Sequence, residues 1–457
     1  MTTRAVATPA GATAGRRASL VAGLVQAGPL AVAGIAANAG SVVVTVVLAR
    51  LLVARGYGAL NQLTGLFFVV STPGSAVLVA VVRKVASWRG DPAGAHPWAA
   101  VLRRRALVAL LAVAAGAVAV GPFVSPALGR HDQVGVDCIV VAGATWVFLC
   151  VDRGILQAHR AYRTLAGNLL TEGVLRTALM LAAGAVGLGV AGVAAGVLVA
   201  EVATAAQARR MAERTWLRSG VTPPAVGTAG LTPGAAVTPV VAPAGAAATG
   251  VPASLRDRSA PRDLAAAVLA LAAVAVLQNV DVIVMGREGP RAAGAYAAIS
   301  VSSKAIVFLA VVVAGYLLPE AAIRWRAGAH ALRQLGVTLT LLAGPAAALV
   351  AVAALVPRRF LSVFFSARYV AAAGAFLPLA LAMTCLSLVV VVTMYLLAVG
   401  DRWIVVLLVL GAATAAGATA AAHGVPGATA GADLAVEAAL VVAGGAEMVR
   451  VHRRRPA

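Results

Sequence analysis

Charged residues are scarce in this sequence. Asp, Glu, Lys and Arg make up only 12% of its 457 residues, whereas about a quarter of the residues are charged in a typical soluble domain. Residues 18–49, 56–82, 106–129 and 369–400 contain no charge at all, and each run exceeds the ~20 residues that cross a hydrocarbon core of ~30 Å. These runs exclude a soluble protein and predict an all-α membrane protein.

Aromatic residues and lysine are also scarce. Aromatics make up 5% of the chain, so most of its apolar residues are small ones, which allow membrane helices to approach closely. Arginine supplies all but two of the 37 basic residues, the exceptions being Lys84 and Lys304. The net charge of +21 would suit a nucleic-acid partner, but the basic residues lie at the ends of apolar runs, which is the membrane pattern. We therefore expect no nucleic-acid partner.

The chain lacks the motifs of an enzyme. Its three cysteines, Cys138, Cys150 and Cys385, lie inside apolar stretches without metal-ligand spacing. No paired carboxylates or nucleotide-binding motif appear, and no expected outer loop exceeds about fifteen residues. We predict no catalytic residue, no metal site and no cofactor. No cleavable signal peptide is expected, because the first apolar run is too long for one.

Charges, Gly/Pro turns and Trp/Tyr residues divide the chain into twelve expected membrane spans. These lie near residues 20–48, 58–82, 105–128, 134–156, 164–185, 188–208, 264–286, 293–319, 334–356, 370–398, 403–422 and 431–449. The last span has the weakest signal, since Asp433, Glu437 and Glu447 dilute it. Pro73–Gly74 marks an expected bend, because proline frees a backbone carbonyl and kinks a helix.

Positive charge predicts the orientation of these spans. With the N-terminus inside, the cytoplasmic segments hold 27 Lys and Arg residues and the outer segments hold eight. This asymmetry follows the positive-inside rule. It predicts an even number of spans with both termini in the cytoplasm. The bias toward Arg and Ala is typical of a GC-rich bacterial genome, so we expect a bacterial cytoplasmic membrane.

A change of composition divides the chain into two halves. Residues 219–254 carry no charge and contain six prolines, which predicts a disordered cytoplasmic connection. The expected parts are a cytoplasmic tail (1–18), a six-helix lobe (19–210), a linker (211–262), a second six-helix lobe (263–450) and a basic tail (451–457).

The two halves also share a pattern. A short Arg-bearing loop and a small/Tyr segment open the second span of each half, at Arg55–Leu60 and at Arg287–Tyr296. Six spans per half, both starting inside, predict a parallel repeat about an axis along the membrane normal. The expected fold is therefore two pseudo-symmetric six-helix lobes.

Several segments resemble those of a known family. They are Asn38 through Leu52, Tyr57–Leu60, Ser71–Ser75, Leu156 through Arg176, Leu277–Asp281, Gly294–Lys304 and Tyr395–Arg402. In order and spacing they resemble the bacterial polysaccharide-biosynthesis oligosaccharide flippases of the multidrug/oligosaccharidyl-lipid/polysaccharide exporter superfamily. The resemblance implies a central cavity between the lobes that opens alternately to each side. It also implies transport of undecaprenyl-diphosphate-linked saccharides to the outer leaflet, in contact with membrane lipid and other polysaccharide-assembly proteins.

Ionisable residues inside spans are candidates for binding cargo, because charge is expensive in the membrane. Arg176 and Lys304 each lie about eleven residues into a span, or ~16 Å deep. Two cations at mid-depth, one in each half, suit a diphosphate headgroup. They can equally serve structural pairing, Arg176 with Glu172 one helical turn away and Lys304 with Asp281. Asn38 can hydrogen-bond either a sugar or a neighbouring helix.

Gln278, Asn279 and Asp281 form a second cluster, near the end of the seventh span. Asp281 is a candidate for binding a coupling cation or a proton; the alternative is a helix-end carboxylate in headgroup water. The functions to be weighed are a flippase of lipid-linked saccharides, an ion-coupled multidrug antiporter, a membrane glycosyltransferase or polymerase, and a scaffold. Buried charges and a two-lobe repeat favour the first two, and two buried cations favour the flippase.

Overall fold

The computed structural model describes residues 33, 40–41, 43–87, 92–129, 132–218, 260–326 and 332–453. The regular elements in these ranges are all helices, as the composition predicts. The expected N-terminal tail, Asn38 and the neutral connection at 219–254 lie outside the described residues.

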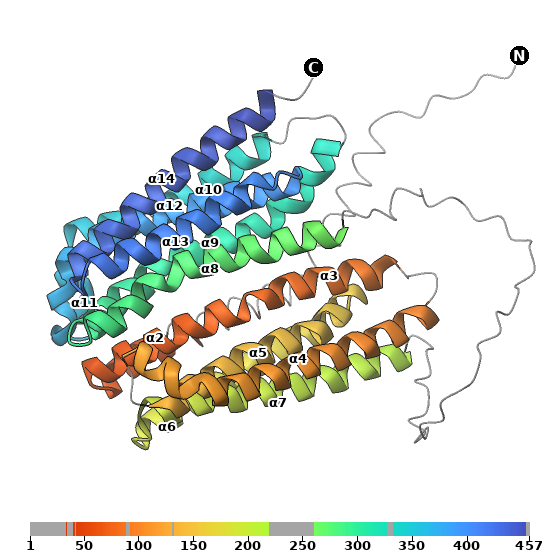
Figure 1. Cartoon of the computed structure of the whole chain (residues 1–457), viewed down its shortest axis with the longest axis horizontal. Coiled ribbons are helices and arrows are strands. Elements are labelled where there is room, and N and C mark those ends of the chain that lie inside the picture. The colour runs from red at the N-terminus through yellow and green to blue at the C-terminus, as the bar shows by residue number, and fades with distance from the viewer. Residues whose placement is uncertain are drawn as a thin grey trace, which may run out of the picture.

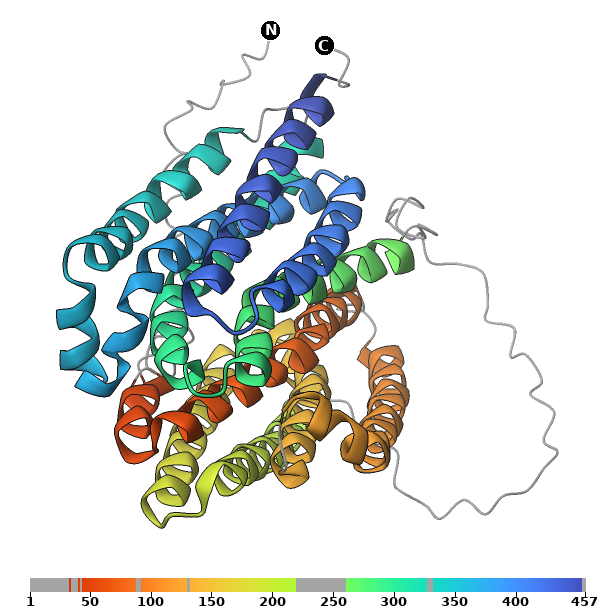
Figure 2. The same ribbon diagram turned by 60° about the vertical axis from the view of Figure 1, so that its left-hand side comes forward.

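Two groups of helices lie side by side (Figures 1 and 2). The first, called the N-lobe, contains α2 (Ala54–Ser71), α3 (Pro73–Ser87), α4 (Pro92–Ala127), α5 (Gln133–Ala158), α6 (Tyr162–Ala185) and α7 (Gly189–Arg218). The second, called the C-lobe, contains α8 (Ala260–Glu288), α9 (Ala293–Arg326), α10 (Leu332–Leu355), α11 (Pro357–Phe364), the 3-10 helix η2 (Ala367–Ala372), α12 (Ala373–Ala398), α13 (Trp403–Ala421) and α14 (Pro426–Arg453).

These helices match the expected spans in order. Within the described ranges, nine helical segments are long and apolar enough to cross a membrane. The helices α6 and α14 are not among the nine, but at 24 and 28 residues they are also long enough to cross ~30 Å at about 1.5 Å per residue. Both carry buried ionisable residues, which lower their hydropathy. Of the first expected span, the described residues 43–51 are helical. The protein is thus a polytopic helical membrane protein.

The second expected span is two helices instead of one. The helix α2 ends at Ser71, Thr72 forms a turn, and α3 begins at Pro73. Proline lacks the N–H that would continue the hydrogen-bond ladder, so a break here is the physical consequence of its position. The helix is thus interrupted at Thr72, directly before the position at which the sequence predicts a bend.

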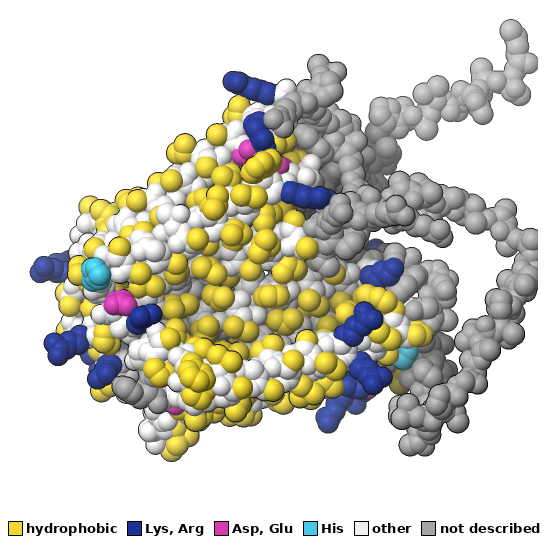
Figure 3. Space-filling model, viewed as in Figure 1, with side chains coloured by type: hydrophobic (Ala, Val, Ile, Leu, Met, Phe, Trp, Pro, Cys, Tyr) yellow, Lys and Arg dark blue, Asp and Glu magenta, His cyan; other side chains and the backbone are white. Residues whose placement is uncertain are grey.

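The two ends of the helix bundle are formed by different connections between helices. At the linker end, on the right in Figure 1, α7 stops at Arg218 and α8 starts at Ala260; at the opposite, distal end lie the turns from Glu288 to Ala293 and from Leu355 to Ala373. On the face shown in Figure 3, Lys and Arg side chains gather at these ends, and hydrophobic side chains cover the flank between them. A lipid-facing flank has this distribution.

The lobes meet mainly through α2, which packs against α8 and α9. The two segments that share the small/Tyr pattern touch at this crossing. A Cβ placed on Gly58 would lie 2.6 Å from the Gly294 backbone nitrogen and 2.8 Å from the Ala293 carbonyl carbon, so only glycine fits at Gly58. Equivalent segments of two repeats meet in this way near a pseudo-two-fold axis along the membrane normal.

Candidate functional site

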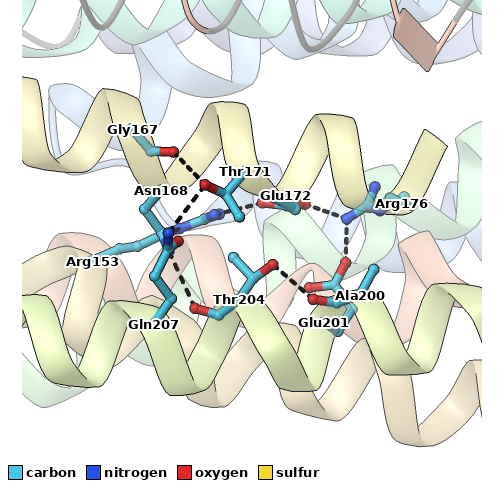
Figure 4. A network of polar contacts seen from close by, with 10 residues as sticks. All are labelled: Arg153, Gly167, Asn168, Thr171, Glu172, Arg176, Ala200, Glu201, Thr204 and Gln207. Carbon is cyan, nitrogen blue, oxygen red and sulfur yellow. Dashed lines mark hydrogen bonds and ion pairs between the residues drawn. The ribbon is translucent and has the colours of Figure 1, made fainter. Parts of the chain in front are cut away.

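A chain of buried ionic contacts joins three helices of the N-lobe (Figure 4). Arg153 of α5 donates from its terminal nitrogen to Glu172 Oε2 of α6 at 2.5 Å, and from Nε to Asn168 Oδ1 at 2.8 Å. Arg176, one turn further along α6, forms ion pairs with Glu172 and with Glu201 of α7. Two guanidinium groups and two carboxylates therefore neutralise each other inside the lobe.

Amide side chains extend this N-lobe network. Asn168 donates from Nδ2 to the Thr204 carbonyl at 3.1 Å and to Gln207 Oε1 at 2.8 Å, while Gln207 Nε2 donates to Thr171 Oγ1 at 3.1 Å. Asn168 has no exposed surface, and both the oxygen and the nitrogen of its side-chain amide have hydrogen-bond partners. Interhelical polar contacts of this kind hold α5, α6 and α7 in a fixed register.

A second polar cluster lies in the C-lobe and has a different charge balance. Lys304 of α9 places Nζ 3.5 Å from Asp281 Oδ1 and 3.4 Å from Asn279 Oδ1, both on α8. Ser300 donates to the other oxygen of Asp281 at 3.3 Å. This cluster is deeply buried, since Asp281 is 0% exposed and the Lys304 side chain 8%.

Two carboxyl groups of α14 complete the C-lobe cluster. Asp433 and Glu437 are each 1% exposed and interact electrostatically with Asp281 and Lys304. Among the described residues, neither carboxyl oxygen of Glu437 has a hydrogen-bond partner, and Asp433 Oδ2 also lacks one. The cluster thus brings together three carboxyl groups and one ammonium group, so acidic groups are in excess. Buried polar atoms without partners are uncommon in native proteins and call for an explanation in each case.

The helix α2 lies between the two networks. The Phe67 ring lies 5.3 Å from the Arg176 guanidinium carbon on the N-lobe side. On the C-lobe side, a Cβ placed on Gly65 would lie 3.4 Å from Asn279 Oδ1, and the Phe68 ring lies 5.7 Å from that of Phe308. Movement of α2 relative to α6 and α7 would change the surroundings of the N-lobe network. Movement of α2 relative to the C-lobe would change those of the C-lobe cluster.

The candidate residues named from the sequence lie in both lobes. Arg176 and Glu172 belong to the N-lobe network, whereas Lys304, Asp281 and Asn279 belong to the C-lobe cluster. The neighbouring Gln278 is buried, with no partner for Nε2 among the described residues. Each of the two cations is paired within its own lobe, Arg176 with Glu172 and Glu201, and Lys304 with Asp281.

Sequence reasoning missed several members of these networks, namely Arg153, Asn168, Gln207, Glu201, Asp433 and Glu437. The Arg153 side chain is 3% exposed and is paired with Glu172 inside the lobe. Glu201 lies within an expected span, so the rule that identified Arg176 would also have found it. No three His, Cys, Asp or Glu side chains in the described ranges are placed to hold a metal ion together.

Comparisons with known proteins identify the fold. No protein-family profile matches the chain, and no curated protein matches its sequence. Among solved structures, it is similar to one titled as the inward-facing conformation of a multidrug resistance MATE family transporter of the MOP superfamily. Identity is 13%, the TM-score is 0.63, and the match covers 91% of this chain and 96% of the other.

Two further structures share the architecture. One is titled as an outward-facing multidrug resistance MATE family transporter, with 13% identity, a TM-score of 0.57, and coverage of 94% of this chain and 96% of the other. The other is a MOP superfamily transporter from Pyrococcus furiosus, whose title reports a binding pocket of reverse polarity that suggests a different function. Its identity is 14%, its TM-score 0.58, and coverage is 93% of this chain and 95% of the other. The chain therefore shares the fold of these proteins over more than nine-tenths of its length.

Proposed function

We propose that the protein is an alternating-access transporter of the multidrug/oligosaccharidyl-lipid/polysaccharide exporter superfamily. Its proposed cargo is a saccharide linked to undecaprenyl diphosphate, which it flips from the inner to the outer leaflet of a bacterial cytoplasmic membrane. The fold supports the transport part of this proposal, because similar structures are titled as transporters in inward-facing and outward-facing conformations.

The observation that carries the ion-coupled transport in this proposal is the acidic excess in the C-lobe cluster. Glu437 has two oxygens without a partner among the described residues, and it lies in a membrane-spanning lobe beside Asp433 and Asp281. Ionisable groups of this kind in membrane proteins mark ion pathways and proton relays. We therefore propose that Glu437 takes up the coupling proton or cation, that Asp433 and Asp281 add to the negative charge that attracts it, and that Lys304 offsets part of this charge when the site is empty.

The proposed cargo rests on the sequence resemblance and on Arg176. This side chain is 24% exposed, in contrast with 3% for Arg153, so it is the more accessible of the two guanidinium groups in the N-lobe network. A diphosphate can accept charge-assisted hydrogen bonds from a guanidinium group in competition with a carboxylate. Asn38 remains a candidate for sugar binding from the sequence alone.

An ion-coupled multidrug antiporter is the second candidate function. The observation that favours it is the same acidic excess, since three carboxyl groups against one ammonium group suit a cationic cargo. In that case the C-lobe cluster would meet the cargo as well as the coupling ion.

An assay in proteoliposomes distinguishes the two cargoes. The full-length protein would be reconstituted with a fluorescent undecaprenyl-diphosphate saccharide, and a membrane-impermeant quencher would report the leaflet that holds the label. Parallel vesicles would contain a cationic dye. We expect protein-dependent flipping of the lipid, slowed about tenfold or more by Arg176→Gln through loss of a charge-assisted contact. Export of the dye without flipping of the lipid would establish the antiporter and contradict the flippase.

A further inference from the structure

Reciprocal hydrogen bonds join the two lobes at the distal end of the molecule. Their C-lobe part is the segment after α10, in which the short helix α11 ends at Phe364 and leads into η2. Their N-lobe part is the described end of the first span, which is helical over residues 43–51. More than 300 residues of sequence separate these two parts.

Arg368 and Tyr369 of η2 bind the end of the first-span helix. Arg368 donates to the carbonyl oxygens of Ala49 and Arg50, at 3.2 and 2.9 Å, and the Tyr369 hydroxyl donates to that of Ala49 at 2.5 Å. The last carbonyls of a helix have no partner within the helix and carry partial negative charge. A guanidinium group is well suited to this position.

Arg50 makes the reverse contact. Its guanidinium group donates to the carbonyl oxygen of Val363 at 2.8 Å and to that of Phe364 at 3.4 Å. These two residues form the C-terminal turn of α11. Each lobe therefore supplies an arginine that caps the C-terminus of a helix in the other lobe.

Aromatic packing lies beneath these hydrogen bonds. Tyr369 is fully buried, and its ring meets that of Tyr57 from α2 edge-on, with 5.6 Å between ring centroids. The Phe365 ring lies 6.5 Å from Tyr57 and 6.2 Å from Tyr369. Arg50 and Arg368, by contrast, are exposed to the surface. Water can therefore replace the polar contacts when the lobes separate at this end. The buried aromatic rings determine how the lobes pack when they come back together.

We infer that Arg50, Arg368 and Tyr369, with the four carbonyls that they bind, form a distal latch that holds the lobes closed at this end. When the lobes part there, each of the two helix ends loses its cap, and water must replace the protein donors. The latch rests on the rearrangement of the lobes in the proposed function, and it does not depend on the cargo.

Distances between spin labels test the latch without a transport assay. Labels on cysteines at positions 186 and 425 would lie on distal turns of different lobes, since Val186 follows α6, Val425 precedes α14, and both are exposed. The native cysteines would be replaced by alanine. Double electron–electron resonance of the full chain in lipid nanodiscs then reports the separation of the distal ends.

We expect Arg368→Gln and Arg50→Gln each to raise the population with long label distances at least about tenfold, as loss of hydrogen bonds from a charged group predicts. Tyr369→Phe keeps the buried ring and should give a smaller shift of the same sign. Arg358→Gln is the matched control, because Arg358 is an exposed arginine of α11 outside the latch.

Two results would overturn the latch. One is a distance distribution in both arginine variants that matches the parent protein. The other is an equal shift in Arg358→Gln, which would assign the effect to lost surface charge. Because Arg50→Gln acts from the N-lobe and Arg368→Gln from the C-lobe, misfolding of one variant still leaves the other as a test. A failed transport assay would leave the latch intact if these distances shift as expected.

Discussion

Replacement of Glu172 by alanine is expected to destabilise the N-lobe by about 3–5 kcal/mol, the cost of removing one partner from a buried ion pair. Glu172 accepts from Arg153 on α5 and from Arg176 on its own helix. Without it, Arg176 retains its ion pair with Glu201, whereas Arg153 keeps its hydrogen bond to the neutral Asn168 but no ion pair among the described residues. An arginine cannot escape this loss by releasing its proton, since guanidinium groups stay charged in proteins.

Thermal unfolding of the purified protein in detergent measures this effect. Glu213→Ala is the matched control, because Glu213 pairs with Arg209 four residues away, as Glu172 does with Arg176, but the pair is about half exposed. An exposed pair contributes about 0–1 kcal/mol, so the control should unfold close to the wild type. The double variant Glu172→Ala/Arg153→Met should recover most of the loss, since both charges leave together. Equal unfolding temperatures for Glu172→Ala and Glu213→Ala would contradict a stabilising role for the buried network.

Replacement of Lys304 by methionine is expected to cost the C-lobe a similar amount, about 3–5 kcal/mol. Among the described residues, Lys304 is the cation that lies beside Asp281 and interacts with Asp433 and Glu437. Methionine keeps much of the length of the side chain, so the effect isolates the charge. The loss arises because three buried carboxyl groups remain with no positive group to offset them.

The chain contains only one other lysine, which provides the control. Lys84 lies on the exposed face of α3, and Lys84→Met should change stability by about 0.5 kcal/mol or less. Asp281→Asn added to Lys304→Met should restore part of the stability, because it removes one of the uncompensated carboxylates. If Lys304→Met unfolds at the same temperature as the wild type, Lys304 does not stabilise the cluster.

The spans could be predicted because membrane helices are determined by local composition. Uncharged runs of more than about 20 residues have few alternatives in a bilayer, and the missing N–H of Pro73 weakens the helix at that position. The shared small/Tyr segments predicted a repeat, although nothing in their residues indicates that Gly58 and Gly294 touch each other.

The ionic partners could not be predicted in the same way. Arg176 and Glu172 are four residues apart and share a helix face, so their contact follows from the helical period. Arg153 and Glu172, or Arg176 and Glu201, come together only when α5, α6 and α7 pack in one register. Arg153 also lies near the end of an apolar run, where an arginine usually fixes topology. An arginine at the end of a span can therefore either determine topology or form a buried ion pair, and composition does not distinguish the two.

The acidic residues of α14 show the same ambiguity. In the sequence, Asp433 and Glu437 lower the hydropathy of the last span and weaken its prediction. In the structure, they are four residues apart on the face of α14 that lies buried near Asp281 and Lys304. The feature that weakened the prediction of the span is thus the feature that supports ion coupling.

Transport driven by an imposed ion gradient tests the proposed coupling most directly. Proteoliposomes would contain the wild type, Glu437→Gln or the control Glu213→Gln, with a proton gradient in one series and a sodium gradient in another. The proposal predicts that one gradient accelerates flipping of the labelled lipid-linked saccharide by the wild type and the control. In Glu437→Gln, flipping should not respond to that gradient, because an amide neither binds a proton at this position nor carries the charge that attracts a cation. An undiminished response in Glu437→Gln would contradict the coupling role of Glu437 and the account of the C-lobe cluster.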